Sequence, residues 1–384
     1  MPLISPSEAE ELMLAHAALL ETESIALEDS LGRILREDLH ADRPFPPFDR
    51  VTMDGIAFRF ADYDGGTLTV QGLHPAGAPD PEALKPGHCW QIMTGATLPP
   101  DCDTIVPYEE VEITDDSATI TCQPEKGIFI HREGSDAPAG TLVLSSGTKI
   151  GPAHHCTAAT IGATHFLATR LPKITILGTG DELVPPHETP LRYQLRQSNG
   201  LTLAAALHAW GPAEVQLHHL ADDLDSTQSG IEQALAQSDL VILSGGISKG
   251  KKDYVRPALE NLIGPPVFHG VTQRPGKPLA FWPGVAALPG NPNSTLTTFH
   301  RYLVPLLNKM VGTPTPSPIN FPLASPIEQH PKLTQFLPAK LTIDGKAEAL
   351  SPQNSGDFLT ALSGTGYLEI PPGNASVSTA LNRS

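Results

Sequence analysis

The sequence predicts a multidomain protein built around a three-layer α/β domain with a mostly parallel sheet, flanked by two β-rich regions. A chain of 384 residues is too long for a single hydrophobic core. Apolar runs alternate with helical stretches between 173 and 311, which is the pattern of parallel strands joined by crossover helices. Short strands with many Gly and Pro residues are expected on both sides of this block.

The N-terminal segment predicts a helix that begins at Ser5. Ser5 is an N-cap, Pro6 suits the first helical position, and Glu8 is placed to complete a capping box. Apolar residues follow at helical spacing as far as Leu20. A second helical stretch is expected over 28–41.

The next region, 42–140, predicts a β-rich insertion. Its first residues, Pro44-Phe45-Pro46-Pro47-Phe48, cannot propagate a helix. Short strands and turns with many Gly and Pro residues follow. The segment 140–151 is another β stretch, and 152–161 is a helix that leads the chain back to the first domain.

The α/β block has a regular order of elements. The predicted strands are 173–177, 213–220, 240–243, 267–272 and 285–288, and the predicted helices are 201–210, 226–237, 255–262 and 294–311. Each strand runs into a polar or Gly/Pro-rich loop. Because the carboxyl ends of parallel strands lie at one edge of a sheet, we expect these five loops to converge on one cleft.

The loop after strand 240–243 carries the clearest chemical signal in this block. Gly245 and Gly246 let the backbone turn sharply and let a ligand approach the amides, so the loop suits an anion. Asp253 adds a carboxylate that suits Mg²⁺. A plain turn is the alternative interpretation of a Gly-Gly pair after a strand.

The C-terminal region predicts a small β domain. A linker rich in Pro occupies 314–318, and strand-like alternation follows over 339–343. Asp344-Gly345 then predicts a hairpin. Ser355 and Lys332 are polar residues of interest in this domain.

Composition limits the classes of function. The net charge of −17 argues against nucleic acid as a partner. The four cysteines show no Cys-x-x-Cys spacing, so neither a zinc site nor a disulfide framework is indicated. No stretch reaches the length of a membrane span, and no signal sequence is recognisable. We therefore expect a cytoplasmic protein with no membrane partner.

Taken together, eight motifs resemble the molybdopterin molybdenumtransferase family, which catalyses the last step of molybdenum-cofactor biosynthesis and is the counterpart of the gephyrin E domain. They occur in the family's order over essentially the whole chain. The motifs are Thr52-Met53-Asp54-Gly55, Ile92-Met93-Thr94-Gly95-Ala96, Glu133-Gly134-Ser135-Asp136, Thr179-Gly180-Asp181-Glu182-Leu183, Ser244-Gly245-Gly246-Ile247-Ser248, Asp253-Tyr254, Pro275-Gly276-Lys277-Pro278 and Leu288-Pro289-Gly290-Asn291-Pro292.

The resemblance implies four domains and a homodimer. A helical/β dimerisation domain would combine 1–41 with 141–171, and the β-rich insertion would occupy 42–140. The α/β molybdopterin-binding domain would occupy 172–316, and a C-terminal β-barrel domain 317–384. The insertion of one subunit would face the α/β domain of the other. Other proteins of molybdenum-cofactor synthesis are possible partners.

The resemblance also implies the reaction and its residues. Molybdate would react with adenylylated molybdopterin in the presence of Mg²⁺, releasing AMP. Two anions must meet, so cations are needed to offset their repulsion. The implied catalytic residues are Asp54, Thr94, Asp136, Glu182, Asp253 and Lys277. The implied substrate-binding residues are Gly245, Gly246, Ser248, Arg274, Lys277, Pro289, Gly290, Asn291, Pro292 and Ser355. The implied Mg²⁺ ligands are Asp181, Glu182, Asp222 and Asp253.

Two other functions remain open at this point. One is an adenylyltransferase that activates molybdopterin with ATP, since that activity uses a similar α/β domain. The other is a non-catalytic dimeric scaffold that binds a protein partner. The flanking domains disfavour the first, and the intact carboxylates disfavour the second.

Overall fold

The computed structural model describes residues 2–247, 254–317, 319–351, 357, 359–360, 363–373 and, for the backbone alone, 379–383. The chain forms two compact units. One comprises Met1–Glu37, Ser146–Pro152 and His165–Ser384, and the other comprises Asp38–Ser145 and Ala153–Thr164. None of the helices in the described ranges is both long enough and apolar enough to cross a membrane.

A six-stranded mixed sheet forms the centre of the first unit, with the order β16-β13-β17-β21-β20-β18. Its strands are β13 (Lys173–Thr179), β16 (Glu214–Leu220), β17 (Leu240–Ser244), β18 (Phe268–His269), β20 (Ala280–Trp282) and β21 (Val285–Leu288). The first four strands of the order are parallel. The predicted parallel block is therefore confirmed for these four, while β20 is antiparallel to both of its neighbours.

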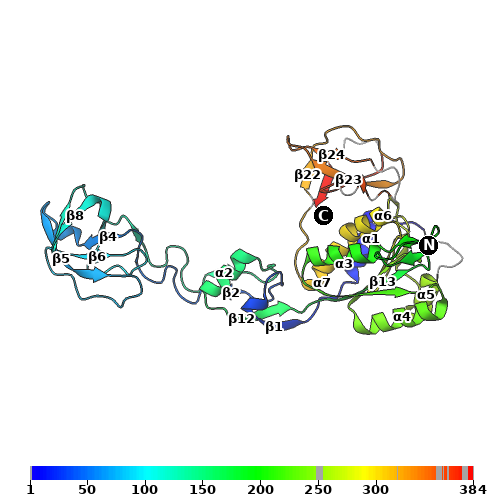
Figure 1. Ribbon diagram of the computed structural model, residues 1–384, viewed down its shortest axis with the longest axis horizontal. Coiled ribbons are helices and arrows are strands. Elements are labelled where there is room, and N and C mark those ends of the chain that lie inside the picture. The colour runs from blue at the N-terminus through cyan, green and yellow to red at the C-terminus, as the bar shows by residue number, and fades with distance from the viewer. Residues whose placement is uncertain are drawn as a thin grey trace. The chain divides into compact units, whose positions relative to one another are not determined.

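Helices cover both faces of this sheet, which gives three layers (Figure 1). The helices are α1 (Pro6–Ala15), α3 (Asn199–Trp210), α4 (Leu224–Gln237), α5 (Val255–Ile263), α6 (Pro292–Thr298) and α7 (Val304–Val311). Leu240 and Ile242 of β17 pack in a core with residues of α1, α3 and α7. Val241 and Leu243 pack on the opposite face with residues of α4 and α5. The apolar run in β17 is thus buried on both sides.

Two expected helices differ from the structure. The stretch 294–311 is interrupted by a π-helical turn, Phe299–Leu303, between α6 and α7. The stretch 28–41 is not an α-helix. It holds only a 3-10 turn, Leu27–Asp29, and then makes backbone bonds to distant segments, such as Leu35 N–H to Thr148 O. By contrast, the predicted cap of α1 is confirmed, since Ser5 Oγ accepts from Glu8 N–H at 3.2 Å.

A second six-stranded sheet closes the first unit. Its strands are β19 (Gln273–Arg274), β22 (Ile319–Phe321), β23 (Thr334–Leu341), β24 (Ala347–Ala349), β25 (Gly366–Ile370) and β26 (Thr379–Arg383). The order is β19-β23-β25-β26-β22, with β24 paired to β23. The predicted hairpin at Asp344-Gly345 is confirmed between β23 and β24. Strand β19 comes from the α/β block but pairs with β23 of this second sheet. Two short pairs complete the unit: β1 (Thr22–Ala26) with β12 (His165–Thr169), and β14 (Leu183–Val184) with β15 (Leu195–Arg196).

The other unit is built mainly on β structure, as its Gly- and Pro-rich sequence predicts. Its six-stranded sheet has the order β7-β4-β6-β5-β9-β8. The strands are β4 (Gly55–Phe58), β5 (Thr67–His74), β6 (His88–Ile92), β7 (Thr104–Pro107), β8 (Val111–Thr114) and β9 (Ser117–Ile120). Two further pairs are β3 (Arg50–Val51) with β10 (Ile130–His131), and β2 (Leu39–His40) with β11 (Leu142–Leu144). Helix α2 (Pro152–Thr160) follows, close to its expected place.

Candidate active site

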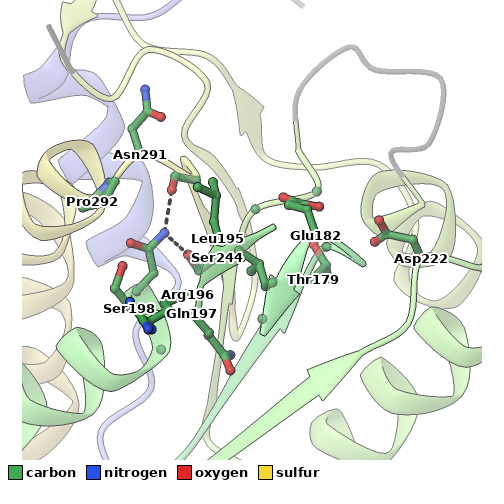
Figure 2. Close-up of a pocket in the computed structure, with 18 residues that line it drawn as sticks. Thr179, Glu182, Leu195, Arg196, Gln197, Ser198, Asp222, Ser244, Asn291 and Pro292 are labelled. Carbon is green, nitrogen blue, oxygen red and sulfur yellow. Dashed lines mark hydrogen bonds between the residues drawn. The ribbon is translucent and has the colours of Figure 1, made fainter. Parts of the chain in front are cut away.

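A pocket of about 460 Å³ opens at the carboxyl edge of the parallel strands (Figure 2). Four of the five loops expected to converge contribute to it, namely those that follow β13, β16, β17 and β21. The described lining residues are Gly178, Thr179, Gly180, Glu182, Leu183, Leu195, Arg196, Gln197, Ser198, Asn199, Gly200, Asp222, Ser244, Gly245, Gly246, Gly290, Asn291 and Pro292. The predicted cleft is confirmed for these four loops.

The glycines after β17 are required by conformation and by space. Gly245 and Gly246 have φ of +94° and +68°, values that L side chains rarely adopt. A Cβ on Gly246 would also lie 2.5 Å from Val255 Cγ2 and 2.9 Å from Thr179 Oγ1. The Gly245 N–H donates to Leu288 O at 3.3 Å, which connects the loops after β17 and β21. The loop is thereby fixed beside the pocket, and these two positions bring no side chain to it.

Carboxylates line another side of the pocket. Glu182 and Asp222 both contribute to its lining, whereas Asp181 is exposed and is not among the described lining residues. Asp181 N–H donates to Asp222 Oδ2, and Asp222 N–H donates to Asp181 Oδ1, both at 3.1 Å. This reciprocal pair fixes the loops after β13 and β16 relative to each other through one oxygen of each carboxylate.

These oxygen donors fit Mg²⁺ in kind. Mg²⁺ usually keeps several waters and takes only one or two protein carboxylates beside substrate phosphates. Within the described ranges, no group of three or more His, Cys, Asp or Glu side chains is placed to hold a metal ion. The described part of the pocket therefore offers Glu182 and Asp222 as a pair. The other expected ligand, Asp253, lies outside the described residues, as does Ser248.

Asn199, at the start of α3, holds two walls of the pocket together. Its Nδ2 donates to Ser244 Oγ at 3.0 Å and to Gly290 O at 2.6 Å (Figure 2). The sequence interpretation missed this residue together with its neighbours 196–198. The available signal was the Ser-Asn pair directly ahead of the helix expected at 201, a pattern typical of helix N-termini.

The fifth expected loop takes a different course. Arg274 and Pro275 line a second cavity, of about 530 Å³, together with residues of the C-terminal sheet. The reason is that Gln273–Arg274 pairs with β23 instead of ending at the pocket. Lys277 is exposed, and neither it nor the buried Pro289 is among the described lining residues of the two cavities. Ser355 lies outside the described residues.

The remaining predicted residues belong to the other unit. Asp54 Oδ1 accepts from the backbone N–H of Thr94 at 2.6 Å, so the structure brings these two residues together. That hydrogen bond lowers the pKa of Asp54 below its ordinary value. Asp136 is linked to Arg50 through His131: Asp136 Oδ1 lies 2.8 Å from His131 Nε2, and His131 Nδ1 lies 3.1 Å from Arg50 Nη2.

Comparison with known protein families defines the class. Three family models match: "MoeA N-terminal region (domain I and II)" over residues 4–162, "Probable molybdopterin binding domain" over 175–309, and "MoeA C-terminal region (domain IV)" over 320–379. The middle match contains β16, β17, β21, most of β13 and every described lining residue of the first pocket. Fold and pocket therefore belong to a protein of molybdenum-cofactor biosynthesis.

Individual relatives narrow this class to a family. The molybdopterin molybdenumtransferase of Synechocystis sp. is 37% identical, over 97% of both chains. Gephyrin of Dictyostelium discoideum is 33% identical over 76% of this chain and 47% of its own. The crystal structure of the molybdopterin biosynthesis moeA protein from Pyrococcus horikoshii OT3 superposes with a TM-score of 0.83 at 25% identity, covering 100% of this chain and 98% of that one. The chain belongs to the molybdopterin molybdenumtransferase family of enzymes.

Proposed function

We propose that the enzyme inserts molybdenum from molybdate into adenylylated molybdopterin, releasing AMP in a reaction that depends on Mg²⁺. The observation that carries the proposal is the pocket at the carboxyl edge of the sheet. There, the carboxylates of Glu182 and Asp222 line the same cavity as Gly245 and Gly246, which bring backbone and no side chain to it. That combination suits a phosphate ester and a hard cation in one place. The family membership supports the same substrates.

In this proposal, Glu182 and Asp222 would hold Mg²⁺, with Asp253 as a further ligand. The reciprocal hydrogen bonds between Asp181 and Asp222 keep the second carboxylate in place before a ligand arrives. When bound, Mg²⁺ would neutralise charge on the phosphate oxygens. Asn199 would keep the walls at Ser244 and Gly290 at a fixed spacing.

Molybdate is the second substrate, and we infer that it binds apart from the phosphate. Arg274 lines the cavity between the α/β block and the C-terminal sheet, and a guanidinium suits a tetrahedral oxyanion. Lys277 and Ser355 remain proposed ligands. We also propose that the enzyme is a homodimer with the four-domain division given above, and that Asp54, Thr94 and Asp136 act on the pocket of the partner subunit.

The direct test supplies purified enzyme with adenylylated molybdopterin and molybdate and measures AMP release with and without Mg²⁺. We expect AMP to appear only when molybdate and Mg²⁺ are both present. A parallel reaction with ATP, Mg²⁺ and molybdopterin should give no adenylylated product. Adenylylation in that reaction, without AMP release in the first, would replace the proposal with an adenylyltransferase.

A further inference from the structure

We propose that Arg196 anchors a phosphoryl group at the end of the first pocket that lies away from Glu182 and Asp222, an inference that rests on the proposed function. Among the described lining residues, Arg196 is the only Lys or Arg side chain. Figure 2 shows it well separated in the view from both carboxylates. The pocket thus has an acidic side and a basic side.

The short strand pair β14–β15 sets the distance between these two sides. Val184 and Arg196 are register partners in this pair. Leu195 N–H donates to Glu182 O at 2.8 Å, and Gln197 N–H donates to Val184 O at 2.9 Å. The backbones of Glu182 and Arg196 therefore belong to one hydrogen-bonded strand pair, and the carboxylate and the guanidinium extend from this shared support.

One hydrogen bond orients the guanidinium of Arg196. Its Nε donates to Glu188 O at 3.1 Å. Within the described ranges, neither Nη1 nor Nη2 donates a hydrogen bond. These two groups form the planar fork that binds two oxygens of a phosphate at once. The side chain is exposed, so it can meet a ligand without a rearrangement of the core.

Helix α3 adds to the same side of the pocket. Ser198 is its N-cap, yet its side chain makes no capping hydrogen bond, and Ser198, Asn199 and Gly200 all line the cavity. The N–H groups and the dipole of a helix start favour an anion. Arg196 lies two residues ahead of this start. The helix alone would not define a site, but it favours the same charge as the guanidinium.

Electrostatics explains why such an anchor is needed. The chain carries a net charge of −17, and the carboxylates of Glu182 and Asp222 line the pocket. A ligand with a phosphate group would be repelled unless a positive group lay within a few ångströms of it. Mg²⁺ would offset the negative charge of the carboxylates on the acidic side, and Arg196 would offset the negative charge of the phosphate on the basic side. The ligand class is therefore a phosphate ester that reaches between the two sides.

The test measures binding of AMP, adenosine and molybdate by calorimetric titration to four proteins: wild type, Arg196→Ala, Arg196→Lys and Arg192→Ala. Loss of a charge-assisted hydrogen bond should weaken AMP binding about 10- to 100-fold in Arg196→Ala. Adenosine binding should stay unchanged, because adenosine has no phosphate. Arg196→Lys should recover part of the loss. Arg192→Ala is the matched control, since Arg192 is exposed in the same loop but does not line the pocket.

The other outcomes separate the two levels of the proposal. If wild type binds AMP and Arg196→Ala binds it equally well, the role of Arg196 is refuted and the proposed function stands. If Arg196→Ala loses molybdate affinity but keeps AMP affinity, the anchored oxyanion is molybdate and the phosphoryl assignment is wrong. If wild type binds neither AMP nor adenosine, the adenylylated substrate itself is refuted, and the role of Arg196 with it.

Discussion

Asn199 offers a sharp test of how the pocket is held open. Its amide joins the end of β17, at Ser244, to the loop after β21, at Gly290, through hydrogen bonds of 3.0 and 2.6 Å. Each such bond contributes about 0.5–1.5 kcal/mol net. Asn199→Ala removes both, so the free energy of unfolding should fall by at most about 1–3 kcal/mol. If loop spacing governs binding, AMP affinity should fall by at most about 5- to 150-fold.

One atom reduces the expected loss in the alanine variant. Asn199 Oδ1 is buried and makes no hydrogen bond within the described structure. An unpaired buried acceptor is itself destabilising, so its removal in Asn199→Ala should offset part of the decrease in the free energy of unfolding. Asn199→Asp keeps that oxygen and also places an acceptor where Nδ2 meets the Gly290 carbonyl. We therefore expect the aspartate variant to be more damaging than alanine, although it preserves the shape.

The assay combines thermal unfolding with calorimetric AMP titration for wild type, both variants and Thr202→Ala. Thr202 lies on the same helix but does not line the pocket, so its variant should bind AMP as wild type does. The reasoning is refuted if Asn199→Asp matches wild type in both measurements, or if alanine is the more damaging substitution.

Three further predictions concern assembly, an ion pair and the partly buried His300. If two subunits share each site, mixing two variants that are each inactive alone should restore activity. Equal amounts of Asp54→Asn and Glu182→Gln, mixed under conditions of subunit exchange, should give about a quarter of the wild-type AMP release. No recovery would place both residues in one subunit's site. Arg170 binds Asp239 through two hydrogen bonds of 2.7 and 2.6 Å and also binds Glu21. Arg170→Met should therefore lower the free energy of unfolding, measured in urea, by about 2–4 kcal/mol. The control Arg256→Met breaks the exposed pair with Glu260 and should lower it by less than about 0.5 kcal/mol. Arg170 lowers the pKa of Asp239 although the burial of Asp239 acts in the opposite direction. The stabilisation by this ion pair is therefore present above the ordinary pKa of Asp and is lost as the pH falls through the pKa of Asp239 in the folded protein. Equal losses of stability in acid for wild type and Arg170→Met would contradict this prediction. Burial lowers the pKa of His300 to about 4. Between about pH 6.5 and pH 4 the unfolded chain therefore binds a proton that the folded protein does not, so the free energy of unfolding should fall by up to roughly 3 kcal/mol as the pH drops through this range. His300→Gln should flatten the dependence of the unfolding free energy on pH there, and an unchanged dependence would show that another group dominates.

The parts of the fold that local sequence determines were predictable. The run at 240–243 is buried throughout, with each residue at most 1% exposed, so an uninterrupted apolar pattern was a reliable indication of a central strand. The capping residues of α1 and the Asp344-Gly345 turn likewise act over a few positions. In each case the interaction that fixes the element lies within the segment itself.

Elements that depend on distant partners were not predictable in this way. The expected helix at 28–41 fails because Leu35 bonds to Thr148 and Arg36 to Leu167, more than one hundred positions away. Arg274 leaves the expected rim for the same reason, since its strand pairs with residues near 334. Local helical or loop propensity is weak compared with such tertiary hydrogen bonding.

The same distinction divides the candidate site into two halves. The side formed by Gly245, Gly246 and the residues after β13 is specified by turns that directly follow buried strands, so the motifs were visible in the sequence. The basic side depends on β15, a strand of two exposed residues with no apolar alternation. Arg196 reaches the pocket because Leu195 and Gln197 bond to Glu182 and Val184. A change in the connecting loop at 185–194 should therefore displace the guanidinium while leaving the glycine turns intact, so the two halves of the pocket can vary independently in sequence.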